Sequence, residues 1–374
     1  MDLVLLIGSL AIILIAAELF TNGIEWFGHK LNLAEGAVGS VLAAVATAMP
    51  ETLIPVIAIL GPVIFGGDPE ASHAIGVGAI LGAPFMLSTL AMFVTGTAIV
   101  LFARGGRRRT DMRVNTGVLG RDVGFFIVGY GIAIGTAFLP EPLAWLKWVA
   151  AILLFVIYAV YVRLHFSDES EEGDAAELNR LHMTRLPGVR PDHLVDVDVL
   201  PGERDAWEEP GVVPGMRIVV GQVALALALI IVGAQVFVGA VEQISLQIGL
   251  EPTILALIIA PIATELPEKF NSVLWVRTGK DTLAMGNITG AMVFQSCLPT
   301  VLGLLFTSWT FTADSAITFA SAGVAFVATV LIFGNMLRTG RLSAWTLLIG
   351  GPLYLIYVYL ALFTDLGRGA LPVH

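Results

Sequence analysis

Residues 46–51 read Ala-Thr-Ala-Met-Pro-Glu, and residues 263–268 read Ala-Thr-Glu-Leu-Pro-Glu. The two stretches align without a gap when the chain is shifted by 217 residues, and each lies inside a long apolar run. Matches of Leu or Ala between apolar helices are common by chance, whereas a Thr-x-x-Pro-Glu within such a run is not. The repetition therefore predicts a chain built from two related halves.

The composition places both halves in a membrane. Hydrophobic residues make up 56% of the 374 residues and charged residues 13%, whereas a soluble domain has about 25% charged residues. A water-soluble enzyme, a nucleic-acid-binding protein or a disordered scaffold would need far more charged surface. The chain is therefore predicted to be an integral membrane protein that binds no nucleic acid.

Ten apolar segments are long enough to cross a bilayer as helices, which takes about 20 residues each. They cover approximately residues 3–27, 36–61, 74–102, 121–139, 143–164, 217–240, 250–275, 283–308, 314–335 and 343–364. The stretch between the fifth and sixth segments holds 13 of the 30 acidic residues and 4 of the 20 basic ones. We predict an all-α polytopic membrane protein with a first five-helix repeat at 1–165, an acidic cytoplasmic loop at 166–216 and a second five-helix repeat at 217–374.

Each half has an odd number of predicted spans, so the two halves would enter the membrane in opposite directions, as an inverted-topology repeat. The positive-inside rule orients them. The connection between the third and fourth spans contains Arg104, Arg107, Arg108, Arg109, Arg113 and Arg121. This connection is therefore predicted to be cytoplasmic, with both chain termini outside, and the cell membrane is the expected location.

Glu51 and Glu268 lie well inside predicted spans, each directly after a proline. An ionised carboxylate at membrane depth costs about 3 kcal/mol on the translocon scale, so its presence needs a reason. Each proline also leaves a carbonyl one turn earlier without its helical donor. Together with the hydroxyls of Thr47 and Thr264, these groups form an all-oxygen set of the kind that hard cations such as Ca²⁺ prefer. An inverted repeat would bring both sets together near the bilayer midplane.

These segments resemble the α-repeats of the sodium/calcium exchanger family, within the cation/calcium exchanger superfamily. Those repeats carry Gly-Thr-Ser-x-Pro-Glu on one helix and Gly-Asn-x-x-Gly-Ser-Asn on the next. The second motif reads Gly-Ala-Ile-Leu-Gly-Ala-Pro at 78–84 and Gly-Asn-Ile-Thr-Gly-Ala-Met at 286–292. The resemblance implies antiport of Ca²⁺ against Na⁺ or H⁺ by alternating access, with Thr47, Glu51, Thr264 and Glu268 at the site. It implies inorganic cations and the lipid bilayer as partners, and neither an enzyme nor an organic cofactor.

The chain departs from the family pattern at several polar positions. Ala48 and Glu265 replace the serines of the first motif, and of the second-motif amides and hydroxyls Asn287 alone remains, expected to support the site. The site therefore has fewer neutral oxygens, which leaves the coupling ion and the preference for Ca²⁺ open. Lys269 either pairs with Glu265 one helical turn away or points into the site and opposes divalent ions.

Three functions thus remain open. The first is Ca²⁺ antiport against Na⁺, and the second is a proton-coupled or other-divalent exchanger of the same fold. The third is a non-transporting membrane protein that retains the fold. The sequence gives no indication of the oligomeric state.

Further expectations concern the scaffold. The fourth and fifth predicted spans are expected to hold no buried ionisable residue and to face the bilayer. The arginines at 104–109 are expected to meet anionic lipid. The glycines at 78, 82, 286 and 290 are expected to allow close helix packing.

Overall fold

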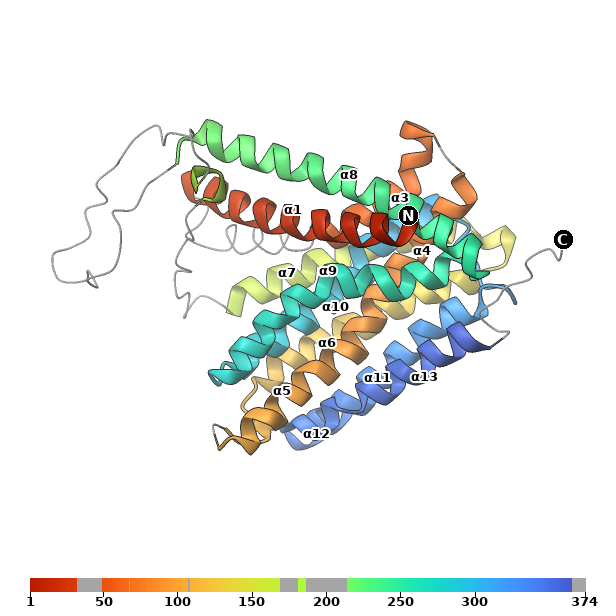
Figure 1. The fold of residues 1–374 in the computed structure, drawn as a ribbon. Coiled ribbons are helices and arrows are strands. Elements are labelled where there is room, and N and C mark those ends of the chain that lie inside the picture. Colours follow the sequence, from red (N-terminus) through yellow and green to blue (C-terminus); the bar gives the residue numbers. More distant parts are fainter. Residues whose placement is uncertain (32–48, 67, 107, 169–180, 186–213, 365–374) are drawn as a thin grey trace.

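The computed structural model describes residues 1–31, 49–66, 68–106, 108–168, 181–185 and 214–364, and these are almost entirely helical (Figure 1). In the first half lie α1 (Asp2–Lys30), α3 (Met49–Phe65), α4 (Pro69–Met86), α5 (Met92–Arg104), α6 (Thr116–Gly135) and α7 (Leu146–Asp168). The second half contains α8 (Met216–Ile248), α9 (Pro252–Arg277), α10 (Asp281–Phe306), α11 (Ala316–Thr339), α12 (Ala344–Leu347) and α13 (Gly350–Phe363).

Within these described ranges, eight helical segments are long and apolar enough to cross a membrane. The segments are Asp2–Gly28, Pro69–Arg104, Thr116–Phe138, Leu146–Leu164, Met216–Ile248, Asp281–Phe306, Ala316–Thr339 and Ala344–Phe363. Two further apolar helices, Glu51–Phe65 and Pro252–Ile262, are shorter. Every predicted span overlaps one of these segments, and the two shorter ones belong to the helices that carry the repeated Pro-Glu motif.

A π-helical turn, η1 (Leu87–Ala91), joins α4 to α5. It follows Pro84, which has no N–H to bond the carbonyl of Ile80, so the α-helical ladder is interrupted there. The hydroxyl of Ser88 donates to the Pro84 carbonyl at 2.8 Å, and that of Thr89 donates to the Phe85 carbonyl. These side chains supply bonds where the ladder is irregular, and the segment continues as one long span.

Helices α1 and α8 lie side by side along one edge of the molecule, while the site-bearing helices pack into a bundle beside them (Figure 1). The pair is closely packed: a Cβ added to Gly23 would lie 2.8 Å from Val223 Cγ2, and one added to Gly233 would lie 2.8 Å from Ile13 Cγ1. A separate small hydrophobic cluster fills their interface, centred on Ala16, Phe20, Ala226 and Ile230. The two helices also share a larger hydrophobic cluster with α3, α4 and α9, which includes Ile13, Phe237, Ile54, Ala79 and Ala256.

Part of the predicted acidic loop is folded against this pair. Leu181 is fully buried, and the 3-10 turn η4 (His182–Arg185) follows it. The His182 N–H donates to Asn22 Oδ1 of α1 at 3.0 Å, and the Met183 N–H donates to Gln222 Oε1 of α8 at 2.8 Å. One described segment of the loop is thus hydrogen-bonded to both helices, and the predicted domain boundaries at 165 and 217 stay predictions.

Two contacts join the halves where α5 ends and α6 begins. The strands β1 (Asp111–Met112) and β2 (Leu342–Ser343) pair antiparallel, with Asp111 opposite Ser343. Nearby, the guanidinium of Arg108 binds the carboxylate of Asp281 at the first turn of α10. The expectation that Arg108 meets lipid is therefore wrong, because its charge is neutralised inside the protein.

The interior of α6 also differs from expectation. Asp122 lies in the seventh position of this helix and is fully buried. The prediction that the fourth and fifth spans hold no buried ionisable residue is therefore wrong. An aspartate near the end of an apolar run is usually interfacial, but this one faces the neighbouring helices.

Candidate functional site

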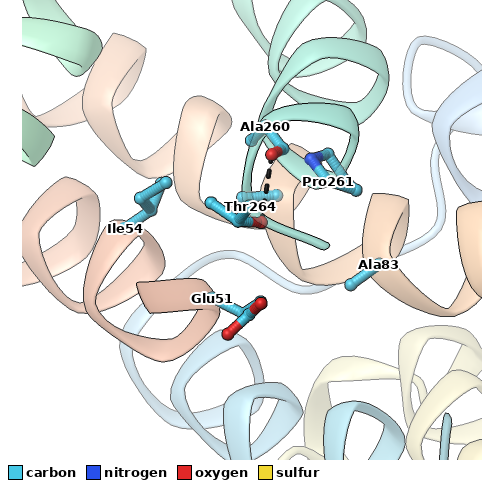
Figure 2. A pocket seen from close by; sticks show the side chains of 7 residues that line it. Glu51, Ile54, Ala83, Ala260, Pro261 and Thr264 are labelled. Atoms are coloured by element: carbon cyan, nitrogen blue, oxygen red, sulfur yellow. Dashed lines mark hydrogen bonds between the residues drawn. The ribbon is translucent and has the colours of Figure 1, made fainter. Parts of the chain in front are cut away.

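A small cavity of about 10 Å³, room for about one water molecule, lies where α3, α4 and α9 meet (Figure 2). Its lining consists of Glu51 and Ile54 from α3, Ala79 and Ala83 from α4, and Ala260, Pro261 and Thr264 from α9. Figure 2 shows the Glu51 carboxylate, Thr264 and Ala83 around one space. The structure thus brings together an acidic residue of the first motif and a threonine of its repeat.

Two glycines of α4 allow this helix to pack directly against α9 beside the cavity. A Cβ on Gly78 would overlap the carbonyl of Thr253, and one on Gly82 would overlap the carbonyl of Leu257. The backbones of α4 and α9 are therefore in direct contact, as expected for these glycines. Gly286, in contrast, has no described atom near a Cβ position, so the expected close packing is not seen there among the described residues.

Glu51 is 7% exposed and lies in the first described turn of α3. Pro55 occupies the position that would donate an N–H to the Glu51 carbonyl, so this carbonyl lacks its helical donor. Glu51 can therefore offer main-chain oxygen as well as carboxylate oxygens. The Glu-x-x-x-Pro spacing from Glu51 to Pro55 is the signal for this carbonyl in the sequence.

Thr264 is buried, and its hydroxyl donates to the Ala260 carbonyl one turn earlier at 3.1 Å. The hydroxyl oxygen still has lone pairs with which it can accept a hydrogen bond or a cation. The neighbouring Glu265 is 1% exposed but does not line the cavity. Two acidic side chains are thus buried at this level of the bundle, one facing the cavity and one beside it.

Asn287 lies on α10, outside the set that lines the cavity. Its Nδ2 donates to Ser272 Oγ of α9 at 3.4 Å, and Ser272 Oγ donates to the Ala284 carbonyl at 3.2 Å. Ser272 was missed in the sequence, although it lies four residues after Glu268 and therefore on the same face of α9. The amide thus links α10 to the face of α9 that carries Glu268.

Several expected site residues lie outside what the structure describes. Thr47 falls in the undescribed range 32–48. Glu268 and Lys269 belong to α9 by their backbone, but their side chains are not described. Among the described residues, no three His, Cys, Asp or Glu side chains cluster together. The shared site of the two motifs therefore stays a prediction.

Comparison with known protein families identifies the family of this chain. The model of the sodium/calcium exchanger protein family matches residues 1–166 and 218–363, which include both motif pairs. The chain belongs to this family. Members of the exchanger family are membrane transporters and not enzymes, so this family member is an integral membrane protein with a transporter fold.

Two individual relatives of this family member are also described as an antiporter or a membrane protein. It is 34% identical over 122 residues to the putative antiporter CaxA of Alkalimonas amylolytica, a match that covers 32% of this chain and 36% of that protein. The matched part is thus about a third of that relative's length. An uncharacterized membrane protein of Methanocaldococcus jannaschii is 20% identical over 300 residues, which is 80% of each protein.

Solved exchanger structures share the fold. The H⁺/Ca²⁺ exchanger CAX superposes with a TM-score of 0.64 at 15% identity, over 97% of this chain and 82% of CAX. A structure of the sodium-calcium exchanger NCX_Mj superposes with a TM-score of 0.54 at 15% identity, over 96% and 97% of the two chains. The similarity to both covers nearly the whole of this exchanger-family chain.

Proposed function

We propose that this exchanger-family protein is a secondary active antiporter that moves Ca²⁺ across the membrane against Na⁺ by alternating access. The observation that carries the proposal is the buried Glu51 carboxylate, which faces Thr264 across a cavity between three helices. Carboxylates at membrane depth are costly and commonly mark ion pathways. Oxygen ligands of this kind suit Ca²⁺.

In this proposal Glu51 and Glu268 bind the cation, and Thr47 and Thr264 contribute hydroxyl oxygens. Asn287 supports the site through its bond to α9. Glu265 adds a third negative charge beside it, which Lys269 on the same helix can balance. The site then carries a net charge of about −2, which matches one divalent ion.

Movement would come from the α1–α8 pair, which lies along one edge of the molecule beside the site-bearing bundle (Figure 1). Rocking of this pair would expose the cavity alternately to the two sides of the membrane. The proposal includes the ten-span inverted repeat, in which α3 and α9 complete the eight longer spans. It also includes external termini, a cytoplasmic 166–216 loop and a location in the cell membrane.

A proton-coupled or other-divalent exchanger is the second candidate. The α4 wall of the cavity consists of Ala79 and Ala83, where the family pattern has polar side chains. Na⁺ needs several neutral oxygens, whereas a proton needs only a carboxylate. The apolar wall therefore favours H⁺ as the coupling ion.

Reconstitution separates these functions. Purified protein in sealed liposomes would be tested for ⁴⁵Ca²⁺ uptake driven by an outward Na⁺ gradient and, separately, by an outward H⁺ gradient. Glu51→Gln should abolish uptake, while Glu70→Gln, an exposed residue in the first turn of α4, should retain it. Uptake with Na⁺ alone supports the main proposal, and uptake with H⁺ alone supports the second candidate. No uptake with either gradient in folded protein would overturn Ca²⁺ as the substrate and leave an exchanger of another divalent ion or a non-transporting protein.

A further inference from the structure

The buried carboxylate of Asp122 links three helices away from the cavity. Thr289 Oγ1 of α10 donates to Asp122 Oδ2 at 2.6 Å, and the Tyr161 hydroxyl of α7 also hydrogen-bonds the same carboxylate. Asp122 and Thr289 are 0% and 1% exposed. One side chain of α6 therefore holds both α7 and α10 by hydrogen bonds in the interior of the bundle.

Thr289 belongs to the Gly-Asn-Ile-Thr-Gly motif of α10, two residues after Asn287. Two residues on an α-helix are separated by about 200° around the axis. Asn287 accordingly bonds Ser272 on α9, while Thr289 bonds Asp122 on α6. At the level of this motif, α10 is thus hydrogen-bonded on opposite faces, and its rotation about its own axis is restricted from both sides.

A carboxylate is a costly way to pack helices together, because apolar residues of similar volume usually do so equally well or better. Its advantage is direction, because the hydrogen bond between Thr289 and Asp122, at 2.6 Å, requires a particular orientation of α10 relative to α6. Other polar groups near Asp122 are the adjacent Arg121, whose Nη1 donates to the Leu164 carbonyl at 3.2 Å, and Tyr161. The Asp122 side chain therefore fixes the orientation of α10 relative to α6 as well as the packing of the two helices.

We propose that Asp122 is a positioning residue for transport. Through Thr289 it sets the rotation of α10, so that Asn287 keeps its bond to the face of α9 that carries Glu268. The predicted effect on Ca²⁺ transport rests on the proposed antiport. The orientation of α10 by Asp122 does not depend on it.

The test compares Asp122→Ala, Thr289→Val and the double variant with Thr329→Val. The Thr289 hydroxyl also lies 3.1 Å from the carbonyl of Met285, four residues earlier. Thr329 is a matched control, because it is a fully buried threonine whose hydroxyl donates to the carbonyl four residues earlier, that of Ala325, and makes no described bond to Asp122. Loss of this buried hydrogen bond should raise the KM for Ca²⁺ uptake about tenfold, with a smaller change in Vmax. The double variant should be no worse than either single variant, because both remove the same bond. Thr329→Val should keep the wild-type KM.

A second readout does not depend on transport. Hydrogen exchange of the backbone amides in residues 284–292 should become faster in Asp122→Ala and Thr289→Val but not in Thr329→Val. Asp122→Asn retains an acceptor for Thr289, so its amide exchange rate should lie between those of wild type and Asp122→Ala. This variant keeps the test informative where the alanine variant folds poorly. If the wild type moves no Ca²⁺, the antiport proposal fails and the exchange data alone decide on positioning. Thr289→Val behaving like Thr329→Val in both readouts would overturn the inference.

Discussion

The guanidinium of Arg108 binds both carboxylate oxygens of Asp281, with Nη1–Oδ1 at 2.8 Å and Nη2–Oδ2 at 2.9 Å. The side chains are 9% and 4% exposed. Arg108 also donates to the Val276 carbonyl, and the Arg113 N–H donates to Asp281 Oδ2 at 2.8 Å. The connection between α5 and α6 is thereby fixed to the junction of α9 and α10, which links the two halves of the chain.

Breaking this pair should destabilise the protein strongly. Arg108→Gln leaves the Asp281 charge buried without its partner, which typically costs about 3–5 kcal/mol of unfolding free energy. Thermal unfolding in detergent should show a clear drop in Tm. Arg109→Gln is the control, because Arg109 is exposed and adjacent. Equal Tm values for the two variants would show that the pair contributes little.

Gly82→Ala should lower the stability of the protein by disrupting the contact between α4 and α9. The new Cβ would overlap the Leu257 carbonyl, and overpacking typically costs about 1–3 kcal/mol. This exceeds the helix-propensity gain of about 1 kcal/mol for replacing glycine with alanine. Gly124→Ala on α6 has no atom within 4 Å of its Cβ and should be neutral or stabilising. Thermal unfolding of both variants checks the difference, and a Gly82→Ala protein as stable as Gly124→Ala contradicts the packing argument.

Ala83→Ser should strengthen cation binding. Ala83 lines the cavity opposite Glu51 (Figure 2), so a hydroxyl there adds one neutral oxygen. A gain of about 1 kcal/mol, that of a typical hydrogen bond, corresponds to a KM for Ca²⁺ about fivefold lower. Ala325→Ser, at a buried position of α11, is the control. An unchanged KM in Ala83→Ser would mean that the cation does not reach this wall.

Gln222→Leu should release the η4 turn without unfolding the bundle. The Met183 N–H would lose its acceptor, and a buried unpaired donor costs about 1–3 kcal/mol. Amide exchange at Met183 should accelerate by at least about tenfold, since 1.4 kcal/mol is a factor of ten. Gln243→Leu changes an exposed glutamine of the same helix and should leave this exchange unchanged. Equal exchange in both variants would show that Gln222 does not hold the turn.

Stability should depend on pH through Glu251, which occupies the N-cap position of α9 and precedes the apolar helix Pro252–Ile262 of the described structure. Burial, and then the negative charge of Asp314, raise the pKa of the Glu251 carboxyl above its usual 4.5. Since the pKa is higher in the folded than in the unfolded protein, stability falls as pH rises from 4.5 through the folded value. Glu251→Gln should therefore have a higher Tm than wild type at neutral pH, with the difference vanishing below pH 4.5. Asp314→Asn should reduce this difference, and a Tm gap independent of pH would contradict the assignment.

The sequence predicted the helices well because a membrane span requires a long apolar run, and within the described residues each predicted run overlaps an apolar helix. It also predicted that Glu51 and Thr264 belong to one site, because the repeat relates their motifs. The role of Ser272 and the burial of Asp122 were not predicted. Hydropathy shows that a segment enters the membrane but not which face of it meets another helix. The contacts of Ser272 and Asp122 depend on which neighbouring helix their face meets.

The irregular turn at Leu87–Ala91 constrains the length of the chain as well as its chemistry. A Cβ on Gly350 would overlap the Thr89 carbonyl, so the start of α13 lies directly against this turn. The turn holds one residue more than an α-helical turn, so the helix keeps its direction on both sides of it. Inserting one residue into the regular α-helix before the turn would instead rotate Thr89 by about 100° relative to α4. The contacts of α4 with α9 and of Thr89 with Gly350 could not then both be kept, so we expect insertions in α4 to be tolerated less well than substitutions at its exposed positions.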